Sequence, residues 1–231
     1  ELTTDVLVLG GGITGVTLAL LLARQGRRVT VLEAETIGSG ATGNSTGNLY
    51  ETLGNGLQQV LSNFGEDVAT QVVAERRAAM GFIEEQCAAH PEAGFRRCPL
   101  LLWAQPSQQE FVEREVAALR AAGCDVHRAS AVPAPLPPAP GDVLVLPGQA
   151  QFQPQAYVVA LARDAAAAGA RFHEHSRVLE IDTKAKRVTT ASGAVRYNEL
   201  VLATHTPKGI HLVHTQMPVH REYGIAFEAP A

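Results

Sequence analysis

The chain has 231 residues, 46% of them hydrophobic and 18% charged, which is enough for a sizeable core, and its net charge of −4 argues against nucleic-acid or anionic-membrane partners. The longest apolar run, Val16 to Ala23, is too short to span a bilayer and lacks the basic leader and cleavage site of a signal peptide. The three scattered cysteines, without metal-ligand spacing, predict free thiols, a cytoplasmic location and no metal site.

Residues 5–33, DVLVLGGGITGVTLALLLARQGRRVTVLE, predict a strand, a glycine-rich turn, a helix and a second strand that ends at an acid. Such a βαβ unit holds the pyrophosphate of a dinucleotide. Gly10 permits the tight turn, Gly12 lets the backbone approach the pyrophosphate, and Gly15 lets the helix pack closely on the strand. The helix N-terminus directs free N–H groups at the phosphates. Glu33 is placed to accept hydrogen bonds from ribose hydroxyls, and its charge disfavours NADP.

The next segment, residues 34–56, is rich in Gly, Ser, Thr and Asn. A simple NAD domain would turn here into another short helix and strand, whereas this loop exposes backbone N–H groups and short hydroxyls along its length. We therefore expect FAD, whose ribityl chain and flavin ring extend beyond the pyrophosphate. A NAD-linked dehydrogenase is the alternative, and a flexible surface loop without a ligand is the other interpretation of the segment.

Two helices and a strand are predicted next. Apolar residues recur with helical periodicity over 56–89, until Pro91 interrupts them. Residues 95–103 favour a strand, and residues 108–122 predict an amphipathic helix that stops at Gly123. The apolar side of this helix is formed by Phe111, Val112, Val116 and Leu119.

The rest of the chain is predicted to alternate between strands and turns around one further helix. A Pro-rich connector at 132–142 cannot lie in a central strand, and a short strand, Val143 to Leu146, follows it. After a helix over 155–169, residues 171–203 predict a third parallel strand, a small antiparallel meander and a fourth parallel strand. Pro218 to Glu228 predicts a strand of a substrate-binding sheet.

Three segments resemble the FAD-dependent D-amino-acid oxidase/glycine oxidase (DAO) superfamily. GGGITG and the following VLEAETIGSGATGNSTGNL are similar to its N-terminal signature, and QFQPQAYVVALAR (151–163) is similar to the segment in which a Pro starts a helix that ends at a Gly, here Gly169. ELVLATHTP (199–207) is similar to the strand that returns to the FAD pyrophosphate, in the version of amine-oxidising, sometimes Rieske-linked, members. The resemblance implies an α/β fold, with a Rossmann-like FAD-binding domain and an interleaved, incomplete α+β substrate domain.

The resemblance also implies cofactor roles for matching residues. Glu33 and Ala34 would hold the adenosine ribose, the backbone of Val178, after the strand RFHEH, would meet adenine, and Thr204 would approach the pyrophosphate from the other side. The pyrophosphate would be held by Gly10, Gly12, Ile13, Thr14 and Gly15. The residues along the pyrophosphate, ribityl chain and flavin would be Ser39, Gly40, Thr42, Gly43, Asn44, Ser45, Thr46 and Gly47.

One departure from the family concerns charge. Many members carry Arg-Asn or Arg-Ser where this chain has Asn44-Ser45, so a cation near the flavin is missing and the electronics or affinity of the flavin are expected to differ. Asn48 offers no chemistry for covalent attachment, so we expect noncovalent FAD.

The domains implied by the resemblance are interleaved along the sequence. Residues 1–90 and 150–206 would form the FAD-binding domain, and residues 91–149 and 207–231 would belong to the substrate domain. The chain opens at Glu1 without a methionine and stops soon after the last predicted strand. We therefore expect an N-terminal portion, whose open sheet edge a second copy or a partner chain would complete.

The implied activity is oxidation of a C–N bond of an amine or amino acid by hydride transfer to flavin N5, with oxygen, a quinone or a protein as electron acceptor. Catalytic candidates are His205, Arg221 and Tyr223. Each also has an ordinary interpretation, as a strand-end residue, a surface ion pair and a packing residue respectively. A non-catalytic nucleotide-binding fragment is the alternative to an enzyme.

Overall fold

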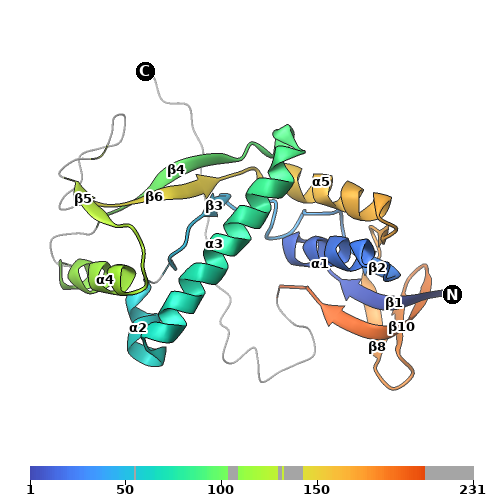
Figure 1. Cartoon of the computed structure of the whole chain (residues 1–231). Helices are drawn as coiled ribbons and strands as arrows, with labels where there is room; N and C mark the ends of the chain where they lie inside the picture. Colours follow the sequence, from blue (N-terminus) through green and yellow to red (C-terminus); the bar gives the residue numbers. More distant parts are fainter. Residues whose placement is uncertain (55, 104–108, 130–131, 133–142, 206–231) are drawn as a thin grey trace. The chain divides into compact units, whose positions relative to one another are not determined.

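The computed structural model describes residues 1–54, 56–103, 109–129, 132 and 143–205. These residues form two compact units, which we call the first unit (Glu1–Thr36 and the described chain from Ala165) and the second unit (Ile37–Asp164). Residues 37–90, grouped with the cofactor domain above, thus lie in the second unit, and their assignment to the cofactor stays a prediction. Figure 1 shows the elements of both units.

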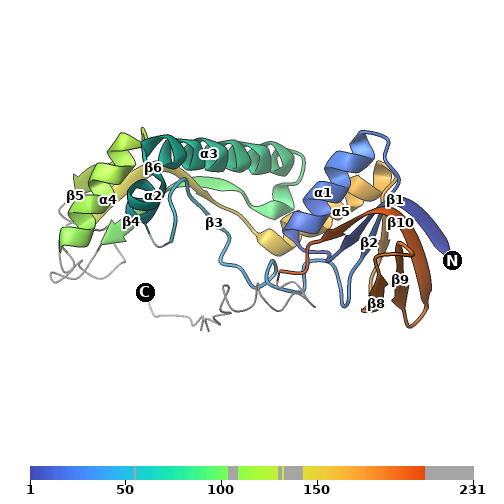
Figure 2. The same ribbon diagram turned by 90° about the horizontal axis from the view of Figure 1, so that it is seen from below.

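The first unit is built on a six-stranded sheet with the order β7-β2-β1-β10-β9-β8. Its strands are β1 (Leu2–Leu9), β2 (Val29–Leu32), β7 (Arg171–His173), β8 (Val178–Asp182), β9 (Arg187–Thr190) and β10 (Gly193–Leu202). β7, β2, β1 and β10 are parallel, whereas β8, β9 and β10 pair as an antiparallel meander, visible in Figure 2. The predicted succession along the chain, a third parallel strand, an antiparallel meander and a fourth parallel strand, is confirmed, and one strand, β10, both ends the meander and forms the fourth parallel strand.

The βαβ unit predicted from residues 5–33 is confirmed. The four residues of β2 and the last four of β1 are buried, as apolar strands inside a parallel sheet are. Helix α1 (Ile13–Arg24) connects them and buries Val16, Ala19 and Leu20. The turn after α1 places Gly26 at a φ of +79°, which glycine adopts without strain.

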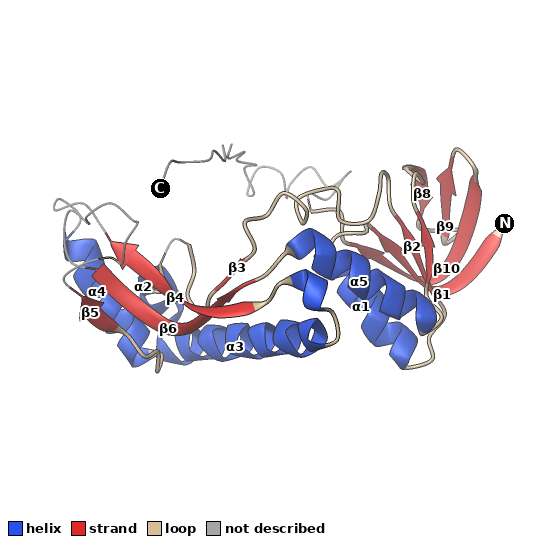
Figure 3. Cartoon of the chain, turned by 90° about the horizontal axis from the view of Figure 1, so that it is seen from above, coloured by secondary structure: helices blue, strands red, loops and turns tan. Residues whose placement is uncertain are grey.

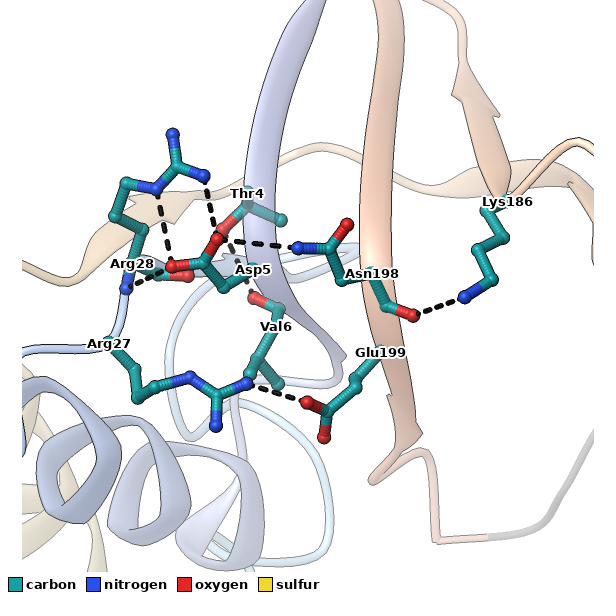
Figure 4. Close-up of polar contacts among 8 residues, drawn as sticks. All are labelled: Thr4, Asp5, Val6, Arg27, Arg28, Lys186, Asn198 and Glu199. Carbon is teal, nitrogen blue, oxygen red and sulfur yellow. Dashed lines mark hydrogen bonds and ion pairs between the residues drawn. The ribbon is translucent and has the colours of Figure 1, made fainter.

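Polar contacts join the start of β2 to β1 and β10 (Figure 4). Arg28 Nη2 donates to Asp5 Oδ1 at 2.6 Å, and Arg28 Nε donates to Asp5 Oδ2 at 3.2 Å. The guanidinium of Arg28 holds the pKa of Asp5 below its usual value. Thr4 Oγ1 donates to the Arg28 carbonyl at 2.7 Å, and Arg27 Nη2 pairs with Glu199 Oε1 at 2.6 Å. These contacts lie beside the start of β2, away from the glycine turn that follows β1.

The second unit has a four-stranded sheet covered by helices. The strands are β3 (Asn48–Leu49), β4 (Arg96–Trp103), β5 (His127–Ala129) and β6 (Val143–Gln151), with the order β3-β6-β4 and β5 also paired to β6. The helices are α2 (Gln58–Phe64), α3 (Glu66–Ala88), η1 (Pro91–Ala93), α4 (Gln109–Ala121) and α5 (Pro154–Ala167), which continues into the first unit. In Figure 3, α2, α3 and α4 lie on one face of this sheet. Their shared core includes Leu57, Val73, Val116, Leu119, Leu144 and Leu146.

Several predicted elements differ from the structure in length. The helix predicted over 56–89 is two helices, because the chain breaks at Gly65, where φ is +87°. The strand predicted to end at Leu146 continues to Gln151, because its pairing with β4 resumes after a register shift at which β6 carries an extra residue and Gly148 has a φ of +73°. Phe111 is 38% exposed, so it does not join the buried side of α4.

The predicted strand RFHEH is shorter than expected. β7 ends at His173, and His175 adopts a left-handed φ of +51°, which lies outside the β region of a regular strand. The connector 133–142 and the strand predicted at 218–228 lie outside the described residues. Within the described chain, no helix combines the length and apolar character needed to cross a membrane.

Candidate functional site

The glycine turn between β1 and α1 packs against backbone on both sides. A Cβ on Gly10, whose φ is +111°, would lie 2.4 Å from the Ala203 carbonyl oxygen. A Cβ on Gly15 would lie 2.0 Å from the Gly10 carbonyl oxygen. The Gly10 N–H donates to the Leu32 carbonyl at 2.9 Å, and the Ala203 N–H donates to the Leu9 carbonyl at 2.8 Å. Hydrogen bonds to the end of β2 and to the residue after β10 therefore fix the turn, and backbone atoms leave no space for side chains at these two positions.

The N-terminus of α1 opens directly after this turn. Gly12 is the N-cap, in an extended conformation, and its carbonyl accepts the Val16 N–H at 3.0 Å. No side chain in the described part of the chain caps the helix at this residue, and its first turn contains no acid. Ile13 is half-buried and Thr14 is exposed. A helix N-terminus of this kind keeps its partial positive charge for an anion such as phosphate.

Glu33 follows β2 and reaches back to the glycine turn. Its Oε2 accepts the Gly11 N–H at 2.6 Å, and its Oε1 accepts the Glu35 N–H at 2.9 Å. The Glu33 backbone is fixed too, because its N–H donates to His173 at 2.9 Å and its carbonyl accepts from Ser176 at 2.8 Å. A carboxylate offers about four lone-pair sites, so this half-buried side chain can accept further hydrogen bonds.

Apart from Val178, the predicted site residues of the first unit lie at the carboxyl ends of three adjacent parallel strands, β2, β1 and β10. β2 and β10 flank β1, so Glu33 with Ala34 and Thr204 stand on either side of the glycine turn. Ligands of open α/β sheets bind outside such strand ends. Val178 opens β8 and packs against a buried cluster that includes Leu32. The contacts of Ala34, Val178 and Thr204 with a cofactor stay predictions.

The catalytic candidates gain no support from geometry. His205 is exposed after β10 and has a left-handed φ of +62°. Arg221 and Tyr223 lie outside the described residues.

Residues 37–47, which form part of the predicted cofactor loop 34–56, are organised by their own hydrogen bonds. The Gly43 N–H donates to the Gly38 carbonyl at 2.7 Å, and Asn44 Nδ2 donates to the Gly40 carbonyl at 2.9 Å. Many family members carry an arginine at position 44. This chain has Asn44 there, and its side-chain amide stabilises the turn.

Both ends of this loop are attached to the segment that leads into α5. Gln155 Nε2 donates to the Ile37 carbonyl at 3.0 Å, and the Phe152 N–H donates to the Gly47 carbonyl at 3.0 Å. The loop residues named above, from Ser39 to Gly47, therefore lie together in the second unit, and their contacts with FAD stay predictions.

A pocket of about 260 Å³ opens beside the end of the loop, within the second unit. It is lined by Ser45, Thr46, Gly94, Arg96, Gln151, Phe152, Gln153 and Pro154. Ser45 and Thr46 were predicted as site residues, and residues 151–154 belong to a family-like segment. The sequence analysis missed Arg96. It lies in a predicted strand, where the alternation of apolar and polar residues indicates which side chains are buried but not which of them line a pocket.

Comparison with known proteins adds the following. Residues 5–230 match the family model described as FAD dependent oxidoreductase (DAO). YhfW of Bacillus subtilis (strain 168), which carries the name of a Rieske 2Fe-2S iron-sulfur protein, is 27% identical over 97% of this chain and 45% of its own length. Gamma-glutamylputrescine oxidoreductase of Escherichia coli (strain K12) is 43% identical over 30% of this chain and 16% of its own length.

Among solved structures, glycine oxidase from Geobacillus kaustophilus has a similar fold, with a TM-score of 0.70 and 24% sequence identity. The match covers 88% of this chain and 55% of that one. The chain thus spans about half the length of YhfW and of this glycine oxidase.

Proposed function

Since the chain belongs to the DAO family of FAD-dependent oxidoreductases, we propose that it is part of an enzyme that binds FAD noncovalently and oxidises a C–N bond of an amine or amino acid. The observation that carries the proposal is the contact between Glu33 Oε2 and the Gly11 N–H at 2.6 Å. It fixes the acid of the motif against the glycine turn. The names of gamma-glutamylputrescine oxidoreductase and glycine oxidase support the substrate class.

The first unit fits the adenosine diphosphate part of FAD. The glycines of the turn carry no side chains, so phosphate oxygens can approach its backbone N–H groups. The N-terminus of α1 offers its partial positive charge to them. Glu33 keeps lone pairs for ribose hydroxyls, and its charge disfavours a 2′-phosphate. The family resemblance assigns the ribityl and flavin part to Ser39, Gly40 and the residues from Thr42 to Gly47.

When bound, FAD would supply the redox chemistry, as the acceptor of a hydride from the substrate carbon. The substrate C–N bond becomes a C=N bond as the nitrogen loses its proton, and water hydrolyses the imine to a carbonyl product and an amine or ammonia. The role of this chain is to bind and orient the reactants, through the glycine turn, Glu33 and the hydroxyls of Ser45 and Thr46. The electrons pass on to oxygen, a quinone or a protein acceptor.

An absorption spectrum of the purified protein tests the cofactor assignment. We expect the visible bands of an oxidised flavin, and after heat denaturation the flavin should appear in the supernatant, because no covalent bond retains it. A colourless protein that takes up no added FAD would contradict the proposal.

A panel of amines and amino acids tests the activity, with reduction of an artificial dye as the readout. We expect turnover of at least one member together with bleaching of the flavin under anaerobic conditions. A flavoprotein that no member of the panel bleaches would limit the proposal to FAD binding.

A further inference from the structure

We infer that Gln155, in the first turn of α5, is a positioning residue for FAD, because it holds residues 37–43 of the cofactor loop in one conformation before the cofactor binds. The inference rests on the proposed function and deepens it, since the affinity for the flavin part of FAD then depends on a residue to which the family resemblance assigns no role. All residues of the argument belong to the second unit.

The side-chain amide of Gln155 lies against the turn that begins the loop. Its Nε2 donates to the Ile37 carbonyl at 3.0 Å, although 118 residues separate the two in sequence. Its Oε1 would lie 2.4 Å from a Cβ on Gly38 and 2.5 Å from a Cβ on Gly43. The same two glycines close the turn, since the Gly43 N–H donates to the Gly38 carbonyl at 2.7 Å. One amide therefore occupies the space that both glycines leave open.

Val158 supports the same turn from a position three residues further along α5. It is fully buried, and its Cγ1 would lie 2.6 Å from a Cβ on Gly38. Residues three apart on a helix are neighbours on one face. The turn is thus fitted to this face of α5, where Val158 supplies an apolar contact and Gln155 supplies a hydrogen bond.

The far end of the loop is held by backbone contacts that do not involve Gln155. The Phe152 N–H donates to the Gly47 carbonyl at 3.0 Å, and a Cβ on Gly47 would lie 2.1 Å from the Phe152 carbonyl oxygen. A substitution of Gln155 should therefore act on residues 37–43 and leave the contact between Phe152 and Gly47 in place. This contact gives the experiment a reference within the same loop.

The anchored start of the loop is buried, whereas polar residues after it are exposed. Ile37 and Gly38 are buried, and Ser39 and Asn44 are exposed. Ser39 and Asn44 are among the residues that the family resemblance assigns to FAD. A flexible loop loses conformational entropy when it binds a ligand, and a loop that is fixed beforehand avoids this loss. The contact of Gln155 with the loop therefore raises the affinity for the part of FAD that the loop binds.

Calorimetric titration of the apoprotein with FAD and with ADP-ribose tests the inference, because ADP-ribose lacks the ribityl chain and the flavin. We expect Gln155→Ala to weaken FAD binding about tenfold and ADP-ribose binding by no more than about twofold. Gln155→Glu should weaken FAD binding at least as much, since it keeps the size of the side chain and replaces the donor to the Ile37 carbonyl by an acceptor. The control is Gln71→Ala at an exposed position of α3, which should bind both ligands like the wild type.

Hydrogen exchange of the apoprotein tests the positioning role separately from cofactor binding. In Gln155→Ala, the Gly43 amide should exchange about fivefold faster or more, because the turn that it closes has lost its support. The Phe152 amide, which holds the far end of the loop, should exchange as in the wild type. Gln155 is exposed, so the melting temperature should change little, and thermal unfolding confirms that each variant is folded.

Three results would overturn the inference. They are FAD affinity that Gln155→Ala leaves unchanged, equal weakening of FAD and ADP-ribose binding, and exchange of the Gly43 amide that does not depend on Gln155. A protein that binds no FAD, but in which Gln155→Ala accelerates exchange at Gly43 and not at Phe152, would contradict the proposed function and leave the positioning of the loop by Gln155 standing.

Discussion

The two units position their polar groups in different ways. In the first unit the predicted cofactor groups are mostly backbone, placed by a contiguous βαβ segment in which Gly10 and Gly15 exclude side chains. In the second unit the polar groups are side chains from distant segments, such as the row formed by Asn48, Gln151 and Arg96. A site built from backbone groups of one contiguous segment can be recognised as a sequence motif. A site built from side chains of distant segments can be recognised only once the pairing of the strands is known.

In the second unit, Glu115 on α4 is the clearest example of a buried side chain that connects distant segments. It is 2% exposed, and its Oε1 accepts from Thr52 Oγ1 at 3.1 Å and from the Leu57 N–H at 2.9 Å. Its Oε2 accepts the Gln58 N–H at 3.0 Å, so one carboxylate from α4 caps the start of α2. Such a capping residue, far along the chain, matches no local capping pattern.

The largest expected effect comes from Gly10→Ala, which tests whether backbone packing governs the first unit. The new Cβ would lie 2.4 Å from the Ala203 carbonyl oxygen at a φ of +111°, so β1 or β10 must shift. We expect a loss of more than about 3 kcal/mol in the free energy of unfolding, together with loss of FAD. Urea unfolding and the flavin spectrum measure both.

Gly26→Ala is the matched control for that substitution. Its φ is +79°, but a Cβ there would meet no atom within 4 Å among the described residues. The cost should therefore be conformational strain alone, about 1–2 kcal/mol, with FAD retained. Equal losses for the two variants would show that strain, and not the contact with β10, makes glycine necessary at position 10.

Glu115→Ala tests the side-chain network of the second unit and should have the next largest effect. It leaves the Thr52 hydroxyl and two backbone N–H groups without their buried acceptor. We expect a loss of about 2–3 kcal/mol in the free energy of unfolding, measured in urea. Glu110→Ala on the same helix removes only an exposed pair, 3.5 Å from Arg114, and should unfold like the wild type.

Glu33→Gln tests the one side chain on which the backbone site of the first unit depends. The amide keeps one acceptor oxygen but turns an NH₂ group toward either the Gly11 or the Glu35 N–H. We expect FAD to bind about tenfold more weakly, with little change in the melting temperature of the apoprotein. Fluorescence titration with FAD measures the affinity. Glu35→Gln, which removes an exposed pair with Arg177, should leave FAD affinity unchanged.

The smallest effect is expected from the exposed contacts around Asp5. Its pKa lies below the ordinary value of 3.8, with hydrogen bonds from Arg28 as the main cause. A carboxylate with a lowered pKa in the folded state contributes stability above the unfolded value and loses it as pH falls through the folded value. Asp5→Asn should therefore lower the melting temperature slightly at neutral pH, and the difference from wild type should vanish in acid. A difference that persists in acid would assign it to packing instead.

The sequence by itself determined the βαβ unit, its glycine turn and Glu33, because these residues follow one another and their spacing reflects local strand and helix geometry. It also predicted the order of the strands that follow α5, since period-two alternation and turn residues mark each of them. The sequence analysis missed the helix break at Gly65 and the full length of β6. Both places contain a glycine with positive φ, and such a glycine can end one element or lie within another.

The tertiary structure alone decided which distant side chains meet. Arg96, Gln151 and Asn48 lie on strands whose partners depend on sheet order, and Glu115 reaches α2 only through helix packing. Pairing and packing of this kind depend on contacts across the whole core, which no local pattern encodes. The sequence therefore predicted the dinucleotide-binding turn, and the tertiary structure revealed the pocket that Arg96 lines.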